Sequence, residues 1–220
     1  MNRTLGGGAV SALILIALRA QPLAAQTDWH VAAAGTGGTV RVRSVTAAGA
    51  EDLSGFVLWA EGVGTLGRIR LRGRYGQGRV TAGGSGSAAP RSLTEGDLAI
   101  EVQAWPWLDL WTGPRARSYV TSGAGGDTRW SYWEAGASLR GTLVPGQLRS
   151  YGEAWMALRG RISVAAVFDG ERGAEGGVIA RVARDNLWAR FGYRIEQTRF
   201  TSGRRETVEA IRFSVGWDLR

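Results

Sequence analysis

The chain has 220 residues and a formal net charge of +8, from 27 basic side chains, all arginine, against 19 acidic ones. It contains no cysteine, which excludes a disulfide scaffold and cysteine-based metal or redox chemistry. Glycine supplies 34 residues, roughly twice average usage, while the hydrophobic fraction is an ordinary 44%. This composition fits neither a helical membrane protein nor a disordered chain.

The first 25 residues predict a secretory signal peptide. Arg3 precedes an apolar run at 9–18, and small residues follow up to Ala25, after which we expect cleavage. An anchored helix is the weaker alternative, because the run is about half the length that spans a bilayer and Arg19 follows it. Loss of two arginines lowers the charge from +8 to +6 and leaves a single mature domain, 26–220.

The mature region alternates apolar and polar residues with a period of two, which predicts half-buried strands. No later apolar run approaches about 18 residues, so a membrane-bound mature chain must span as a barrel. The expected strands lie near 39–46, 53–61, 66–76, 96–105, 108–121, 130–143, 150–167, 175–184, 187–199 and 207–219.

The predicted connections alternate in length, which is typical of an up-and-down barrel with short periplasmic turns and longer outside loops. Long loops are expected at 47–52, 77–95, 122–129, 168–174 and 201–206, and short turns at 62–65, 106–107, 144–147 and 185–186. The fold class is therefore all-β, a closed antiparallel transmembrane β-barrel of about ten strands. Eight or twelve strands stay open, because 29–34 would form a separate strand if the glycines at 35–38 bend the chain.

The closing strand carries apolar or aromatic residues at alternate positions up to the end of the chain: Phe213, Val215, Trp217 and Leu219. With the signal peptide and the alternating strands, this strand makes the chain resemble small bacterial outer-membrane β-barrel proteins. The resemblance implies an outer-membrane location, contact with outer-membrane lipid, and recognition of these four residues by the envelope assembly machinery. Arg220 departs from the class, whose chains usually end on the aromatic residue itself.

Tryptophan placement also follows this topology, since interfacial aromatic residues collect at the two ends of membrane strands. Eight of the ten fall near expected periplasmic ends, although Trp188 has lumen-facing parity. The eight are Trp29, Trp59, Trp105, Trp107, Trp111, Trp155, Trp188 and Trp217.

The alternation of side chains along each expected strand places most arginines and several glutamates on the lumen side, Arg41, Arg43 and Glu61 among them. The candidate lumen-lining residues are Arg68, Arg70, Arg72, Arg74, Glu101, Arg115, Arg117, Glu134, Arg140, Glu153, Arg159, Arg161, Arg190, Arg194, Glu196 and Arg212. A narrow barrel favours a salt-bridged plug, and hence a structural or surface-interaction role. An excess of inward arginine over glutamate would instead favour a narrow anion-selective pore. A soluble periplasmic β-barrel that binds a small anionic ligand is the second alternative.

Catalysis is not expected. The single histidine, His30, lies at the wrong end of the barrel for the chemistry of outer-membrane hydrolases. Asp169, Glu171 and Glu175 are expected to be solvated loop acids, since their spacing fits no calcium loop. We therefore expect no enzyme, no cofactor, no metal and no nucleic-acid partner, while the sequence specifies neither a surface ligand nor an oligomeric state.

Overall fold

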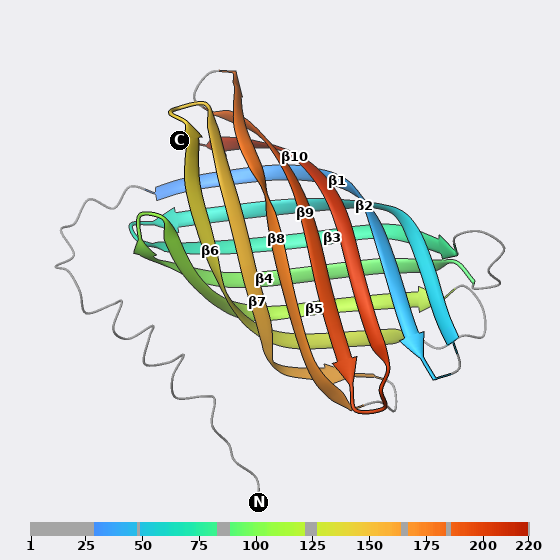
Figure 1. Ribbon diagram of the computed structural model, residues 1–220. Helices are drawn as coiled ribbons and strands as arrows, with labels where there is room; N and C mark the ends of the chain where they lie inside the picture. The colour runs from blue at the N-terminus through green and yellow to red at the C-terminus, as the bar shows by residue number, and fades with distance from the viewer. Residues whose placement is uncertain are drawn as a thin grey trace, which may run out of the picture.

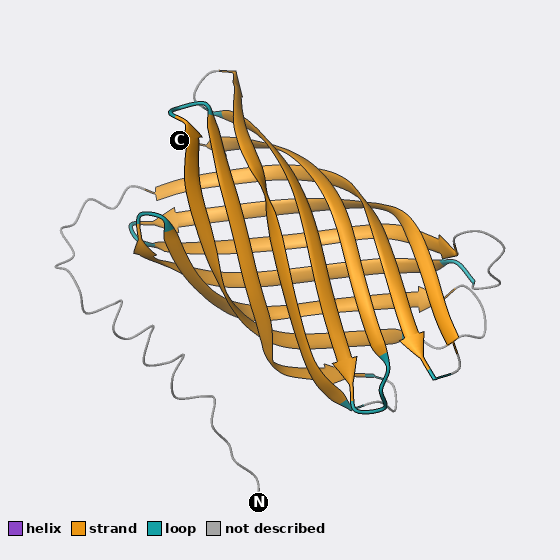
Figure 2. Cartoon of the chain, in the orientation of Figure 1, coloured by secondary structure: helices purple, strands orange, loops and turns teal. Residues whose placement is uncertain are grey.

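The structure, a computed structural model, describes residues 29–47, 49–82, 89–121, 127–163, 167–183 and 186–219, and the expected signal peptide lies outside these ranges. Every strand pairs antiparallel with its neighbours in the chain, and the first pairs with the last, which closes a ten-stranded barrel (Figures 1 and 2). The strands are β1 (Trp29–Thr46), β2 (Gly49–Leu66), β3 (Ile69–Ala82), β4 (Arg91–Trp105), β5 (Leu108–Thr121), β6 (Thr128–Val144), β7 (Leu148–Ile162), β8 (Phe168–Ala183), β9 (Leu187–Phe200) and β10 (Arg205–Leu219).

The expected fold class and the count of ten strands are confirmed, but several expected boundaries are wrong. The expected turn 62–65 belongs to β2, and the ends of the expected loop 77–95 belong to β3 and β4. β1 runs straight through the glycines at 35–38, because β10 and β2 pair with it on both sides along this stretch. The expected loop 47–52 shrinks to a tight connection, since Thr46 pairs directly with Gly49. The expected loop 168–174 is strand, because its residues pair with β9, so β8 begins at Phe168.

The two ends of the barrel differ in their connections. The end that carries the starts of the odd-numbered strands and the C-terminus, here called the turn end, has tight turns between β2 and β3 and between β6 and β7. Gly67 and Gly146 occupy these turns with φ of +57° and +73°, a conformation that favours glycine. The opposite end is called the loop end. None of the described residues belongs to a helix able to cross a bilayer.

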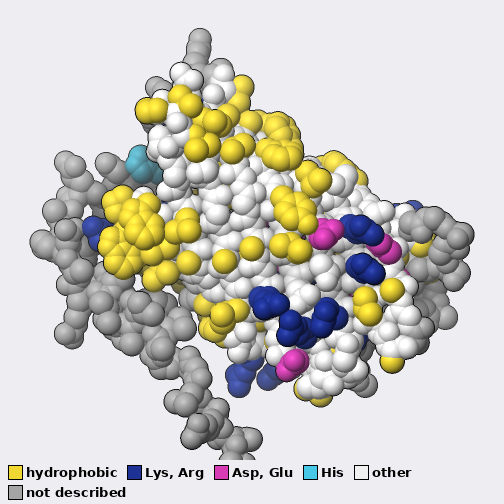
Figure 3. All heavy atoms as spheres, in the orientation of Figure 1, with side chains coloured by type: hydrophobic (Ala, Val, Ile, Leu, Met, Phe, Trp, Pro, Cys, Tyr) yellow, Lys and Arg dark blue, Asp and Glu magenta, His cyan; other side chains and the backbone are white. Residues whose placement is uncertain are grey.

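The outer surface is apolar over most of the strand length. On β10, Ile211, Phe213, Val215, Trp217 and Leu219 all point outward, each about half exposed. Apolar side chains cover the part of the surface nearer the turn end, and arginines and acids gather nearer the loop end (Figure 3). The period-two pattern in the sequence therefore corresponds to the two faces of one closed sheet.

Several tryptophans face the lumen instead of the membrane interface, which corrects the expected girdle. Trp59, Trp111 and Trp155 are buried, whereas Trp105, Trp107, Trp133 and Trp217 are exposed. Each of these three buried indoles lies across a glycine directly opposite on the next strand, at the pairs Trp59–Gly76, Trp111–Gly136 and Trp155–Gly173. The missing side chain of the glycine leaves the space that the indole fills.

Candidate functional site

The lumen is filled in layers, and the inward residues of β5 give their order from the turn end: Asp109, Trp111, Arg115, Arg117 and Tyr119. Nearest the loop end lies an apolar cluster, within which Trp130 packs edge-on against Tyr119 and Phe200. The cluster comprises Val40, Val42, Leu53, Val57, Trp59, Val80, Leu93, Tyr119, Trp130, Tyr132, Phe200, Val208 and Ala210.

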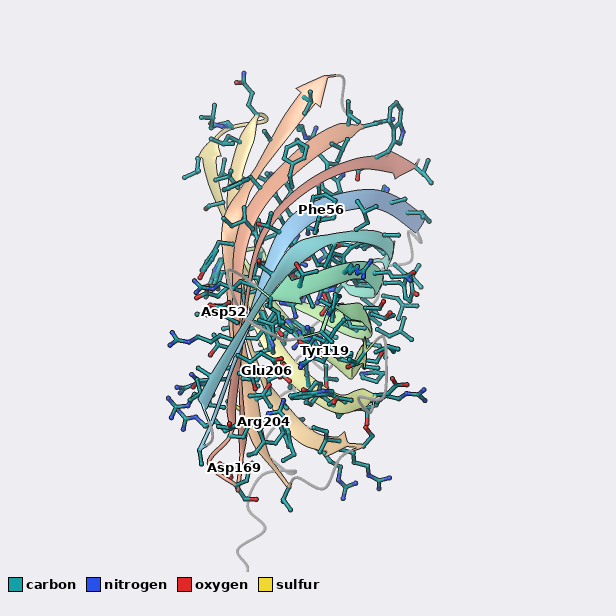
Figure 4. All side chains as sticks on the ribbon, turned by 90° about the vertical axis from the view of Figure 1, so that its right-hand side faces the viewer. Asp52, Phe56, Tyr119, Asp169, Arg204 and Glu206 are labelled. Atoms are coloured by element: carbon teal, nitrogen blue, oxygen red, sulfur yellow. The ribbon has the colours of Figure 1, made fainter. Side chains whose placement is uncertain are left out.

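Polar groups line the mouth of the barrel beyond this cluster. The hydroxyl of Tyr119 donates to Glu206 at 3.0 Å, and Arg204 lies 3.6 Å from the same carboxylate. Figure 4 views this end and shows Tyr119 and Glu206 within the ring of strands. An open cavity of about 540 Å³ lies here, lined in part by Arg91, Arg204 and Glu51.

The middle of the lumen holds a charged layer centred on Arg115. Its guanidinium lies 2.9 Å from Glu95, 3.4 Å from Glu134, 3.4 Å from Glu171 and 2.7 Å from Glu196, and its side chain is 1% exposed. We call this set, together with two more arginines that also pair with Glu196, the arginine–glutamate layer; those two are Arg117 and Arg194.

This layer is held by strands from opposite walls of the barrel. Its members come from β4, β5, β6, β8 and β9, so the ion pairs cross the lumen instead of following one strand. Trp59 adds a further contact, because its indole nitrogen donates to Glu95 at 2.6 Å. Buried charges are stable only when paired and hydrogen-bonded, and here each guanidinium meets at least one carboxylate.

The turn half of the lumen is more open. Arg70 lies 2.7 Å from Glu101 and 3.2 Å from Asp109, and Arg72 lies 3.0 Å from Glu153. A cavity of about 480 Å³ opens at this end, lined by these groups and by the exposed His30. The arrangement is a vestibule on the turn side of the arginine–glutamate layer, and Trp111 lies between the two along β5.

The structure places most of the candidate lumen residues inside the barrel. Those on the lumen side are Arg70, Arg72, Arg74, Glu101, Arg115, Arg117, Glu134, Arg140, Glu153, Arg190, Arg194, Glu196 and Arg212. The four residues of the expected assembly signal, Phe213, Val215, Trp217 and Leu219, all lie on the outer face.

Three candidates are corrected. Arg68 is exposed in the turn between β2 and β3, one residue before β3 begins, so the alternation of β3 does not set its direction. Arg159 and Arg161 point outward, because Leu158 is skipped in the β6–β7 pairing and this β-bulge reverses the parity of the residues after it. Arg41 and Arg43, also expected inside, are exposed on the outer face of β1. They pair with Glu209 and Thr207 of β10, which lie on the outer face too.

Sequence reasoning missed several lumen acids. Glu171 and Glu175, expected to be solvated, are buried, and Glu175 pairs with Arg212. Glu95, Asp97, Asp109 and Glu206 also face inward. With these acids included, the described lumen carries no marked excess of arginine. If the alternation of β8 is extended back toward Phe168, it predicts that Glu171 and Glu175 face the lumen.

The described residues hold no cluster of three or more histidine or acidic side chains arranged to bind a metal ion. The carboxylates of the lumen are occupied by arginine, as the distances above show. What the site offers chemically is a dense network of charge-assisted hydrogen bonds across a narrow barrel.

Comparison with known proteins gives only structural likenesses: no family model matches the chain, and no curated protein sequence matches it. An outer membrane channel from Pseudomonas putida F1 has a TM-score of 0.50 and 8% identity, over 90% of this chain and 99% of that one. Neisserial surface protein A has a TM-score of 0.40 and 14% identity, over 87% and 96%. The translocator domain of the autotransporter NalP from Neisseria meningitidis has a TM-score of 0.40 and 13% identity, over 94% of each chain. The fold is therefore that of bacterial outer-membrane β-barrels, as the sequence resemblance implied.

Proposed function

We propose that the protein is an integral outer-membrane barrel with a closed, non-conducting lumen and a structural or surface-interaction role. Its turn end faces the periplasm and its loop end faces outward, as in barrels of this architecture. The apolar outer face of β10 runs over the nine positions from Ile211 to Leu219, which matches the roughly 9–11 residues of a membrane-spanning strand.

The arginine–glutamate layer carries the proposal of a closed lumen. Arg115, Arg117 and Glu196 have side chains 1% exposed in the middle of the barrel, so ordinary solvent has little access there. The apolar cluster closes the same lumen on the loop side. A conducting filter needs ions to enter and leave easily, whereas these guanidinium groups are already engaged by carboxylates.

A filled lumen leaves the surface of the barrel as the part available for interaction. The strands extend past the apolar face at the loop end, where β1 continues through Arg41 and Arg43 to Thr46. Outward polar groups in this region face solvent or headgroups instead of lipid chains. A surface-interaction role is therefore favoured over transport through the lumen and over catalysis.

Conductance of the purified parent barrel in planar bilayers tests this proposal. Folding is checked first by heat-modifiable gel mobility, and we expect no reproducible conductance steps. Arg70→Ala with Arg72→Ala should cost about 3 kcal/mol or more of stability, because Glu101 and Glu153 lose buried partners. The matched control Arg79→Ala, on the outer face of the same strand, should change stability by no more than about 0.5 kcal/mol.

Anion-selective steps from the unmutated protein would establish the pore alternative in its place. A double variant that stays as stable as the parent but loses selectivity would lead to the same conclusion. Quantitative extraction of the parent from cells as a soluble monomer, without detergent, would contradict the membrane placement and favour a soluble periplasmic barrel.

A further inference from the structure

One sector of the outer surface carries a concentration of outward-facing arginines. They lie near the loop end on β7, β8, β9, β10 and β1, which are consecutive neighbours around the barrel. We call this set the outer arginine belt: Arg159, Arg161, Arg172, Arg199, Arg205, Arg41 and Arg43, all exposed. In Figure 3 its arginines, with a few acids, form the charged patch on the loop-end side of the apolar surface.

The belt begins directly where the apolar face ends. Along β9 the outward positions change from Tyr193 and Ile195 to Gln197 and Arg199. Along β8 the outward residue after Ala174 is Arg172, and along β7 Leu158 is followed at once by Arg159. If the apolar face spans the hydrocarbon core, these guanidinium groups lie at the depth of the lipid headgroups.

Protein partners neutralise only part of the belt. Arg41 donates through Nε to both carboxylate oxygens of Asp52, at 2.9 and 3.0 Å. This hydrogen bond lowers the pKa of Asp52 below its ordinary value, so the carboxylate stays ionised and offsets the charge of Arg41.

No carboxylate forms an ion pair with the other arginines of the belt in the described residues. Arg172 and Arg199 donate to the side-chain oxygen of Gln197, at 3.4 and 3.2 Å, and a neutral amide removes no charge. The remaining four belt arginines make no side-chain hydrogen bond or ion pair within the part of the chain that the structure describes; they are Arg43, Arg159, Arg161 and Arg205. The outward acids of this sector are the exposed Asp169 and the half-buried Asp52 and Glu209, and among the described residues they are fewer than its arginines.

We propose that the outer arginine belt binds the phosphate groups of membrane-lipid headgroups in the leaflet at the loop end. The fork of donors on each guanidinium matches phosphate oxygens in a bidentate geometry, and such charge-assisted bonds are the strong ones. Arginines spread over five adjacent strands would hold several headgroups, or one headgroup that carries more than one phosphate. The inference rests on the membrane placement proposed above and adds the class of partner.

The test uses the full barrel inserted into phosphatidylcholine vesicles with and without about 20% phosphatidic acid, in which both lipids carry phosphate but only the second is anionic. Flotation and heat-modifiable mobility first confirm insertion and folding. The barrel is then extracted in detergent and washed, and the retained lipids are quantified by mass spectrometry. We expect at least about fivefold enrichment of phosphatidic acid over its share in the vesicle.

The belt variant combines Arg43→Gln, Arg159→Gln, Arg161→Gln and Arg205→Gln, which removes the four arginines whose side chains make no hydrogen bond or ion pair in the described residues. It should lose most of the enrichment while it still inserts and folds. The control combines Arg68→Gln, Arg79→Gln, Arg149→Gln and Arg181→Gln, exposed arginines outside the five strands of the belt or at the turn end, and removes the same charge. The control should retain phosphatidic acid to within about twofold of the parent.

Three results would overturn the inference. The belt variant could retain phosphatidic acid like the parent, or a carboxylate lipid such as oleate could be retained as well as the phosphate lipid. Inorganic phosphate alone could stabilise the detergent-solubilised parent as strongly as phosphatidic acid does, which would mean that the belt binds free phosphate and not specifically a lipid headgroup. A parent that fails to enter neutral vesicles would contradict the membrane placement itself, so the two failures are distinguishable.

Discussion

At the residue scale, the pairing of tryptophan with glycine accounts for two unusual features of the composition. Trp59 lies flat across Gly76, and a β-carbon on that glycine would sit 2.0 Å from Cδ1 of the indole. Trp155 covers Gly173 and Trp188 covers Gly216 in the same way. Ten tryptophans and 34 glycines are therefore partly explained by the need to fill a narrow lumen with large side chains.

The variant Gly76→Ala tests this packing. The new methyl group collides with the buried indole of Trp59, so the stability of the barrel should fall by about 1–3 kcal/mol. The control Gly62→Ala, where no atom lies within 4 Å of the added carbon, should leave stability unchanged or slightly raised. Denaturant unfolding followed by tryptophan fluorescence measures both, and equal effects at the two positions would contradict the packing.

At the element scale, β10 and β7 show how a strand's alternation holds and how it breaks. In β10 the inward and outward positions alternate without interruption, and the inward Ser214 accepts a hydrogen bond from Thr36 of β1 at 2.7 Å. In β7 the bulge at Leu158 adds one residue, so the outward set shifts to Arg159 and Arg161. One unpaired residue thus moves two arginines from the lumen to the outer surface.

The same substitution at two outward positions of β10 locates the edge of the membrane. Val215→Arg places a charge at lipid depth and should cost about 2–4 kcal/mol, or prevent assembly. Thr207→Arg lies on the same face near the loop end, beyond Ile211, and should be tolerated. The folded fraction in isolated outer membranes, measured by heat-modifiable mobility, compares the two; similar losses would place the apolar boundary elsewhere.

At the scale of the whole molecule, closure of the barrel removes the sheet edges and fixes which connections lie at the same end. Pairing of β1 with β10 removes both free sheet edges, which is required of a sheet that spans lipid. With ten strands, the turns at Gly67 and Gly146 share one end of the barrel with the start of β1 and the end of β10, and the connection at 201–204 lies at the other end.

Single-cysteine labelling tests this orientation, because the natural chain contains no cysteine and any introduced thiol is unique. Ser202→Cys, in the connection between β9 and β10, should react with a membrane-impermeant maleimide on intact cells. Gln147→Cys, exposed in the turn between β6 and β7, should react only after the outer membrane is permeabilised. The reverse pattern would invert the topology. Residues 83–88 of the expected outside loop 77–95 lie outside the described residues.

The sequence by itself determined the features that depend on local alternation. Phe213, Val215, Trp217 and Leu219 share a face because successive side chains of any strand point to opposite sides, and the same rule sends Arg70, Arg72 and Arg74 inward. Up-and-down chain order then implies a barrel with even strand number. These inferences need no knowledge of which strand lies beside which.

Only the tertiary structure decided the features that depend on pairing between strands. The bulge that turns Arg159 and Arg161 outward exists in the β6–β7 hydrogen-bond register, and the period of β7 alone does not reveal it. Arg115 of β5 meets Glu171 of β8 and Glu196 of β9, residues 56 and 81 positions away, because closure brings opposite walls of a narrow barrel within reach. The balance of charge in the lumen, and with it the preference for a plug over a pore, is therefore a property of the closed barrel.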